Sequence, residues 1–379
     1  EHDRHDGRWW NRSDAENLAA ELRASGKAIV ERVKQTEKSE WPPLAYDLTE
    51  LQRDANRRFG FSAKKTLNVL QKLYEQHKLV TYPRTDSRYL PDDIVPTLKG
   101  RIERVAVGPY APFARKLLQK EPAIMKRIVD NSKVSDHHAI IPTDEPVRLD
   151  MLSADERKLY DLIVRRFLVL FFGPYRYLET AVVFRAGKRL LFAKGKVEKD
   201  AGWKGLYQSD AELSDDGETP FDESESLPPQ RLPELKAGDA VTVRSAEVKE
   251  GRTLPPPRYT EASLLTEMEK HGLGTPATRA DIIEKLLFTG TIERSGQSLI
   301  PTMKGRQLIE LVTDELKSPE MTAHWERELE QIARGKGDPA AFMRGIREQA
   351  AKWVAQIKEE TKEYRPHNAT NSRCPQCGK

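Results

Sequence analysis

Apolar residues recur at helical spacing in the first quarter of the chain. Leu67, Leu70 and Leu73 fall on one face of a helix that Ser62 is placed to cap. Thr49, with a glutamine three residues later, forms a capping-box pattern that predicts the start of an earlier helix. We therefore expect two consecutive helices here, in the manner of a helix-turn-helix unit.

Alternation replaces helical spacing in the middle of the chain. Residues 180–184 and 190–192 are rich in β-branched and aromatic side chains and flank Gly187, which predicts two strands joined by a turn. Residues 28–33 and 240–248 have a similar composition, and we expect a strand in each. The sequence thus predicts a β-rich part built from segments far apart along the chain.

The last third combines two helical patterns, 263–270 and 275–287, with a predicted hairpin over 291–294 and 298–301. Helix, helix, hairpin is the order of a winged helix, which commonly reads nucleic acid. Helical spacing then continues, and we expect a buried apolar face on the terminal helices, formed by Trp325, Leu329, Ile332, Phe342, Ile346, Trp353 and Ile357.

Composition excludes several classes of protein. The 379 residues carry 63 Lys and Arg against 59 Asp and Glu, so a nucleic-acid partner must be argued from particular residues. The longest apolar run, Phe167–Phe172, cannot span a bilayer, and no secretory signal opens the chain. Two cysteines exclude a disulfide scaffold and favour a reducing compartment. We interpret the acidic stretch between Asp210 and Glu225 as a solvated loop.

The segment around Tyr82 carries residues suited to phosphate chemistry. A phenol has a pKa near ~10 and needs nearby positive charge before it can attack a phosphodiester. In an extended chain residues two apart share a face, so Tyr82 and Arg84 can present hydroxyl and guanidinium together, although Pro83 can disturb the alternation. Arginine suits this role because its planar fork grips a phosphate with two bonds.

Two further clusters could bind an anion. His137 and His138 precede an apolar run, where paired histidines are more often structural than catalytic, and no cysteine or third histidine completes a zinc shell nearby. A protonated histidine can still contribute charge to a phosphate. The run from Gly272 through Thr275 to Thr278 and Arg279 opens a helix, where backbone amides favour a phosphate.

Together these segments resemble one family, the type IA DNA topoisomerases, and within it the bacterial topoisomerase III branch. The matching segments follow one another over nearly the whole chain: Pro42–Leu48, Gly60–Thr66, the Tyr82 segment, the histidine segment, Pro257–Ala262, Gly272–Thr278, and Met321–Ala323 leading to Leu329.

The resemblance implies a role for each matched residue. Tyr82 would be the nucleophile that forms a 5′-phosphotyrosine link to a cut single strand, Arg84 would hold the scissile phosphate, and His137 would be the active-site histidine, with His138 as the alternative register. Cleavage, strand passage and religation would need no ATP, because the phosphotyrosine bond conserves the energy of the cleaved bond. We expect further DNA contacts from Lys64, Lys65, Asp86, Ser87, His138, Tyr259, Thr278 and Arg279.

The chain departs from the family in its metal-binding part. Type IA enzymes carry a Toprim domain whose acidic cluster binds Mg²⁺, but no Asp-x-Asp triplet occurs in this sequence. We therefore expect a piece of a longer protein, impaired in religation and relaxation by itself. Cys374 and Cys377 have the spacing of half a zinc ribbon, and Zn²⁺ would need two further ligands.

Two other functions remain open from the residues. A tyrosine recombinase would use His324, Arg327 and Tyr364, but a four-residue match arises by chance more easily than several matches in order. A non-catalytic module that only holds single-stranded DNA would give salt-sensitive complexes and no covalent adduct.

The resemblance and the local patterns together predict an α+β fold of several domains. Residues 1–45 and 174–254 would form a β-rich arch that bridges a gate, and a helical domain, 46–173, would carry Tyr82 as an insertion. Residues 255–365 would form a helical, winged-helix-like DNA groove, and 366–379 would begin a zinc-ribbon region. We expect a cytoplasmic, nucleoid-associated monomer that acts on single-stranded DNA, with a RecQ-type helicase and a single-strand-binding protein as partners.

Overall fold

The computed structural model describes residues 9–119, 126–208, 231–359 and 375–377, and the chain forms two compact units. The first unit comprises residues 1–43 and 169–255, and the second comprises residues 44–168 and 256–379. Each unit is therefore assembled from two separate stretches of sequence. The fold class is α+β, as the sequence predicts, and the Asp210–Glu225 stretch, expected to be a solvated loop, lies outside the described residues.

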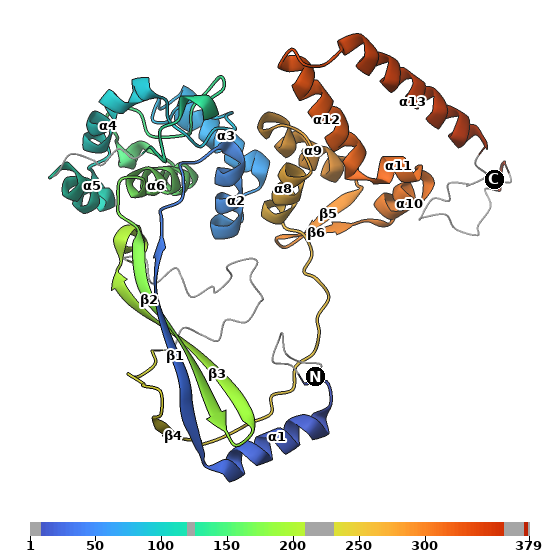
Figure 1. Ribbon diagram of the computed structural model, residues 1–379. Coiled ribbons are helices and arrows are strands. Elements are labelled where there is room, and N and C mark those ends of the chain that lie inside the picture. The colour runs from blue at the N-terminus through green and yellow to red at the C-terminus, as the bar shows by residue number, and fades with distance from the viewer. Residues whose placement is uncertain (1–8, 120–125, 209–230, 360–374, 378–379) are drawn as a thin grey trace. The chain divides into compact units, whose positions relative to one another are not determined.

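The first unit is built on a four-stranded antiparallel sheet in the order β3-β2-β1-β4. Three long strands run side by side in Figure 1. Helix α1 (Arg12–Ser25) precedes the sheet and ends at Gly26, which adopts φ +62°. The strands are β1 (Lys27–Glu40), β2 (Tyr175–Ala186), β3 (Arg189–Asp200) and the short β4 (Ala240–Thr242).

The hairpin predicted around Gly187 is confirmed, and its strands are longer than the apolar runs. Ala186 pairs with Arg189 across a two-residue turn, and Gly187 has φ +59°, which suits this turn. The expected strand over 240–248 is too long, because only Ala240–Thr242 pairs with β1. Backbone pairing with β1 therefore ends where the apolar pattern alone would have continued.

The second unit is helical around α6, which is buried along much of its length. Leu159, Ile163, Phe167 and Leu168 of this helix are almost fully inaccessible to solvent. The first stretch of sequence in the second unit forms α2 (Leu48–Phe59), α3 (Ala63–Glu75), α4 (Leu98–Arg104), α5 (Ala111–Leu118) and α6 (Ala154–Val169). The two consecutive helices expected near the start are confirmed as α2 and α3, and Ser62 caps α3 as predicted.

The predicted start of α2 is wrong by two residues. Asp47, rather than Thr49, is the N-cap, and its Oδ1 accepts a hydrogen bond from the Glu50 amide at 2.7 Å. Aspartate competes well with threonine for this position. Thr49 lies inside the first turn of α2, where its hydroxyl accepts a hydrogen bond from Arg279.

The second stretch of this unit has the predicted winged-helix order. Helices α8 (Glu261–Lys270) and α9 (Pro276–Phe288) precede a hairpin of β5 (Ile292–Ser295) and β6 (Ser298–Pro301). The remaining helices are α10 (Met303–Leu311), α11 (Asp314–Lys317), α12 (Pro319–Ala333) and α13 (Pro339–Glu359), and the short α7 (Gly205–Gln208) belongs to the first unit.

The two stretches of the second unit join where α2 and α3 meet α8 and α9. The Ala63 amide at the start of α3 donates to Glu261 Oε2 at 2.7 Å. The Ala262 amide at the start of α8 donates to Asn56 Oδ1 at 3.0 Å. Each helix start thus donates a hydrogen bond to a side chain of the other stretch, in addition to its own N-cap, Ser62 for α3 and Thr260 for α8, and Leu265 lies in the apolar cluster beside these bonds.

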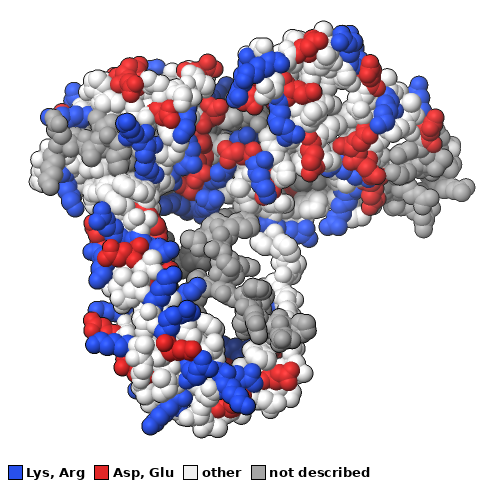
Figure 2. Space-filling model, viewed as in Figure 1, with Lys and Arg blue, Asp and Glu red and all other residues white. Residues whose placement is uncertain are grey.

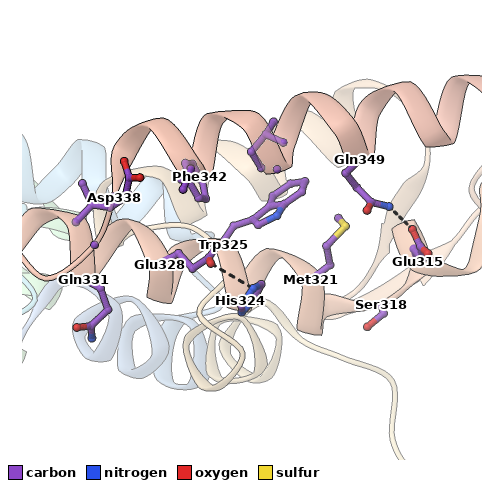
Figure 3. A pocket seen from close by; sticks show the side chains of 15 residues that line it. Glu315, Ser318, Met321, His324, Trp325, Glu328, Gln331, Asp338, Phe342 and Gln349 are labelled. Atoms are coloured by element: carbon purple, nitrogen blue, oxygen red, sulfur yellow. Dashed lines mark hydrogen bonds and ion pairs between the residues drawn. The ribbon is translucent and has the colours of Figure 1, made fainter.

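The buried face expected on the terminal helices is only half-buried, at Trp325, Ile332, Phe342, Ile346 and Trp353. Leu329 is 44% exposed and Ile357 51%, and none of the described residues of α13 is buried. The inner faces of α12 and α13 line an open groove of about 820 Å³, into which Trp325 and Phe342 point (Figure 3). Helical periodicity marks an apolar face, but it does not supply the partner that would bury it.

Charge is distributed without one continuous basic patch on the face drawn in Figure 2. Lys and Arg are frequent over the long strands, and the helices of the second unit carry both signs. None of the described helices is long and apolar enough to cross a membrane.

Gly202 tests the packing of the first unit. Its φ is +48°, and an added Cβ would lie 2.4 Å from the Pro174 carbonyl oxygen. We expect Gly202→Ala to destabilise this unit by about 2–4 kcal/mol, which combines backbone strain with a steric clash. Thermal unfolding followed by circular dichroism measures the effect.

Gly187→Ala is the matched control, because Gly187 has φ +59° with no atom within 4 Å of the added Cβ. It should show the backbone strain alone. Equal losses in the two variants would contradict the clash at Gly202.

Candidate active site

The segment that follows Tyr82 has no regular secondary structure, yet its side chains alternate strictly. Pro83, Thr85 and Ser87 are buried, while Arg84 and Asp86 are exposed. This is the two-residue period of an extended chain, and Pro83 does not disturb it. One face of the segment is therefore fixed in the protein, and the other presents a guanidinium and a carboxylate to solvent.

Hydrogen bonds from the buried face hold the segment in place. Thr85 Oγ1 donates to the His137 carbonyl at 2.9 Å, and Ser87 Oγ donates to the Lys133 carbonyl at 2.8 Å. The Leu48 amide at the start of α2 donates to the Thr85 carbonyl at 3.1 Å. The segment is thus hydrogen-bonded both to residues 133–137, which include His137, and to the first turn of α2.

The Tyr82 ring lies between two other rings. Its centroid is 4.1 Å from that of His137, with the planes inclined by 34°, and 5.6 Å from that of Tyr74 in an edge-to-face arrangement. His138 is half-buried, its Nδ1 lies 2.8 Å from the Ala139 carbonyl, and burial lowers its pKa. Of the two histidines, His137 is the one that contacts the tyrosine.

A small cavity of about 190 Å³ opens beside His137, whose ring lies against that of Tyr82, and Tyr82 itself does not line the cavity. Its walls come from three segments that are far apart in sequence: Arg84–Asp86, Ser135–His137 and Thr275–Ala277. The tyrosine segment, the histidine segment and the start of α9 therefore meet at one place. A cavity of this size, with a guanidinium and an imidazole in its walls, can hold a phosphate-sized group.

The start of α9 is fixed locally by its own hydroxyls. The Thr275 amide donates to Thr278 Oγ1 at 2.8 Å. Gly274 has φ +65°, which favours glycine, and a Cβ there would lie 2.8 Å from Ile282 Cδ1, which would have to shift. The loop thereby delivers Thr275 to the cavity, with Thr278 exposed nearby on the same helix.

The residues predicted to contact DNA occupy several environments. Asp86, Thr278 and Tyr259 are exposed. Lys64 and Lys65 are partly exposed and form ion pairs with Asp281 at 2.7 Å and Asp155 at 2.8 Å, respectively. The two that the structure buries are Ser87, 4% exposed, and Arg279, 6% exposed.

Arg279 is bonded to protein on several sides. Its Nη1 donates to Thr49 Oγ1 at 3.0 Å, and its Nε donates to the Leu273 carbonyl at 3.2 Å. Glu269 Oε1 lies 3.8 Å from Nη1. A motif match could show that an arginine follows Thr278, but it could not show that the side chain turns inward.

Asp47 is a residue that the sequence argument missed as part of this region. It is 6% exposed, and burial raises its pKa to about 6, against the opposing effects of the Glu50 amide and the Arg88 charge. It precedes Leu48, whose amide donates to the carbonyl of Thr85 in the cavity wall. The signals in the sequence were an aspartate before a helical pattern and its place in the family-matching segment Pro42–Leu48.

The described residues contain no group of three or more His, Cys, Asp and Glu side chains that could hold a metal ion. Cys377 is exposed, and Cys374 lies outside the described residues. His324 and Arg327 lie on α12, where His324 Nε2 is 3.6 Å from Glu328 Oε1, and Tyr364 is also outside the described residues.

Comparison with known proteins shows the class. The sequence profile of the DNA topoisomerase family matches residues 1–344. The full-length topoisomerase I of Thermotoga maritima superimposes with a TM-score of 0.68 at 25% identity, covering 98% of this chain and 58% of that one. The chain therefore belongs to the DNA topoisomerase family, with the fold of the type IA core.

The relatives narrow the assignment to one branch. DNA topoisomerase 3 of Bacillus licheniformis is 47% identical over 391 residues, which cover 98% of this chain and 52% of the relative. DNA topoisomerase 3 of Bacillus subtilis is 47% identical over 372 residues, covering 93% and 50%. Within the type IA class the chain is of the bacterial topoisomerase III type, and it spans about half the length of these relatives. The recombinase alternative is thereby removed.

Asp47 makes stability depend on pH. Because its folded-state pKa of about 6 lies above the ordinary value of 3.8, the folded protein holds this proton more tightly, and stability falls as pH rises from 4 to 6. Asp47→Asn keeps the helix cap and removes the charge. We expect it to raise stability by about 1–3 kcal/mol at pH 7.5 and to have little effect near pH 4. Urea unfolding at the two pH values measures this difference.

Asp130→Asn is a control of opposite sign. Asp130 also caps a turn, but a hydrogen bond from Ser132 lowers its pKa, so its substitution should not stabilise the protein at pH 7.5. If Asp47→Asn changed the free energy of unfolding equally at both pH values, burial would not be raising the pKa of Asp47.

Proposed function

We propose that this chain carries the strand-cleaving half of a type IA topoisomerase site, with Tyr82 as the nucleophile. The observation that carries the proposal is the meeting of three segments at one cavity, with Arg84 and His137 in its walls and His137 against the Tyr82 ring. The substrate we propose is single-stranded DNA, as the family resemblance implies.

The chemistry is a transesterification at phosphorus. The Tyr82 oxygen attacks the phosphorus atom, the bond from phosphorus to the 3′ oxygen breaks, the phenol loses its proton and the departing 3′ oxygen gains one. Arg84 would bind the non-bridging oxygens and stabilise the charge that develops on them. The reverse attack by the 3′ hydroxyl reseals the strand, and no ATP is needed because one ester replaces another.

His137 would assist beside the tyrosine. Its ring stacks on Tyr82 and is exposed at the cavity, so a protonated imidazole can donate to a phosphate oxygen. His138 would serve only near the edge of the bound strand, because its ring faces the Ala139 carbonyl.

Other contacts with the strand would come from exposed groups. We propose Thr278, Tyr259 and Asp86 as direct contacts, and Lys64 and Lys65 as charges that can exchange their present ion pairs for phosphates. Ser87 is better suited to holding the segment, because its hydroxyl is bonded to the Lys133 carbonyl.

The residues present do not fit the Mg²⁺ that the family uses. Asp86 and Asp136 line the cavity, but the described residues bring no third ligand to them. We therefore derive no step through a metal, and we propose that an acidic Toprim domain must be added before religation is complete. Residues 1–45 and 174–254 would serve as the arch and 255–365 as the strand groove.

The first test is covalent trapping on a labelled single-stranded oligonucleotide, with and without Mg²⁺ and with a Toprim domain supplied in trans. We expect an SDS-resistant adduct on the 5′ phosphate that is lost in Tyr82→Phe. Tyr74→Phe is the matched control, since it also removes a hydroxyl from a ring of the same cluster and should leave the adduct intact. Binding without any adduct would favour the non-catalytic DNA holder, and an adduct in Tyr82→Phe would refute the assignment.

Arg84→Lys separates charge from geometry. Lysine keeps the charge but loses the two-pronged grip, so we expect cleavage to fall about 100-fold while binding changes by less than about threefold. Single-turnover cleavage and fluorescence anisotropy measure the two quantities. Equal losses in both would place Arg84 in general DNA binding.

A further inference from the structure

Arg279 has surroundings unlike those of a DNA-contacting arginine. It is 6% exposed, and each end of its guanidinium group has a protein partner: Leu273 on its own loop and Thr49 on α2. A buried charge is costly unless paired, and Glu269 provides the opposite charge. Arg53 of α2 also forms an ion pair with Glu269, so this one carboxylate lies near both Arg53 and Arg279.

The partner on α2 is connected directly to the tyrosine segment. Thr49 follows Leu48, whose amide donates to the Thr85 carbonyl at 3.1 Å. Thr85 stands between Arg84 and Asp86, both in the cavity wall. Two residues, Leu48 and Thr85, and the hydrogen bond between them therefore connect Thr49 to the arginine proposed to hold the phosphate.

Arg279 itself lies on α9, the helix whose start forms another wall of the cavity. It follows Thr275–Ala277 by half a helical turn, and its Nε bond to Leu273 closes the loop that leads into α9. One side chain therefore links the loop before α9 to α2, which is bonded to the Arg84-bearing segment. Because the guanidinium is planar and forked, it fixes direction as well as distance between them.

We propose that Arg279 is a positioning residue, which sets the start of α9 against the Arg84-bearing segment through Thr49 without touching DNA. The proposal rests on the proposed function for its catalytic consequence. Its structural part, the register of the two cavity walls, can be measured without any cleavage.

The test uses Arg279→Lys and the pair Thr49→Val and Thr49→Ser. Valine has the shape of threonine without the hydroxyl, and serine retains the hydroxyl. We expect Arg279→Lys and Thr49→Val each to slow single-turnover cleavage about 10-fold, with DNA affinity unchanged within about twofold. Thr49→Ser should restore cleavage to near the original rate. The double variant should be no worse than either single one, since both remove the same bond.

The salt dependence of binding distinguishes positioning from direct contact. An arginine that neutralises a phosphate contributes to the slope of log K against log salt, and its loss lowers that slope by about 0.7 for a single strand. Arg279→Gln should leave the slope unchanged if the residue only positions. A reduced slope would overturn the proposal and make Arg279 a DNA contact.

Hydrogen exchange gives a readout that does not need activity. In Arg279→Lys and Thr49→Val, faster exchange confined to residues 46–49 and 83–90 would support the positioning role. This holds even if the original protein forms no covalent adduct with DNA. The missing adduct would contradict the proposed function and not the positioning role. Unchanged exchange in those peptides, or equal acceleration throughout the second unit, would overturn the positioning role.

Discussion

The exchange of hydrogen bonds between α2–α3 and α8–α9 is the interaction on which the rest of the site depends. Glu261 accepts from the Ala63 amide at the start of α3 and Asn56 accepts from the Ala262 amide at the start of α8, and both side chains come from the opposite stretch of chain. Unpaired amides at a buried helix start are costly, so either stretch alone would leave such groups unsatisfied. The two stretches therefore fix each other, and this places the loop before α9 beside the tyrosine segment.

The site itself combines an exposed face with a buried anchor. Arg84 and Asp86 reach solvent because Thr85 and Ser87, which alternate with them, bond to carbonyls behind them. The same division applies to α9, where Thr278 is exposed and the following arginine is buried. Exposed side chains that can contact a substrate and buried side chains that hold the backbone in place are thus neighbours in sequence. Burial distinguishes the two roles.

The order of elements was predictable because it depends on short-range physics. Two helices near the start, a hairpin at Gly187, and the helix-helix-hairpin order after residue 260 follow from side-chain periodicity and turn chemistry. The α2 cap was misplaced because two neighbouring residues could both fill it. The faces of α12 and α13 were misassigned because periodicity identifies an apolar face without identifying what covers it.

The sequence by itself determined the family and the identity of the chemically capable residues, since ordered motifs and side-chain chemistry are local properties. Only the tertiary structure decided which of them meet. It chose His137 over His138 as the neighbour of Tyr82, and it turned Arg279 toward Thr49, 230 positions away along the chain. Such contacts depend on burial and on the paths of distant segments, which no local pattern encodes.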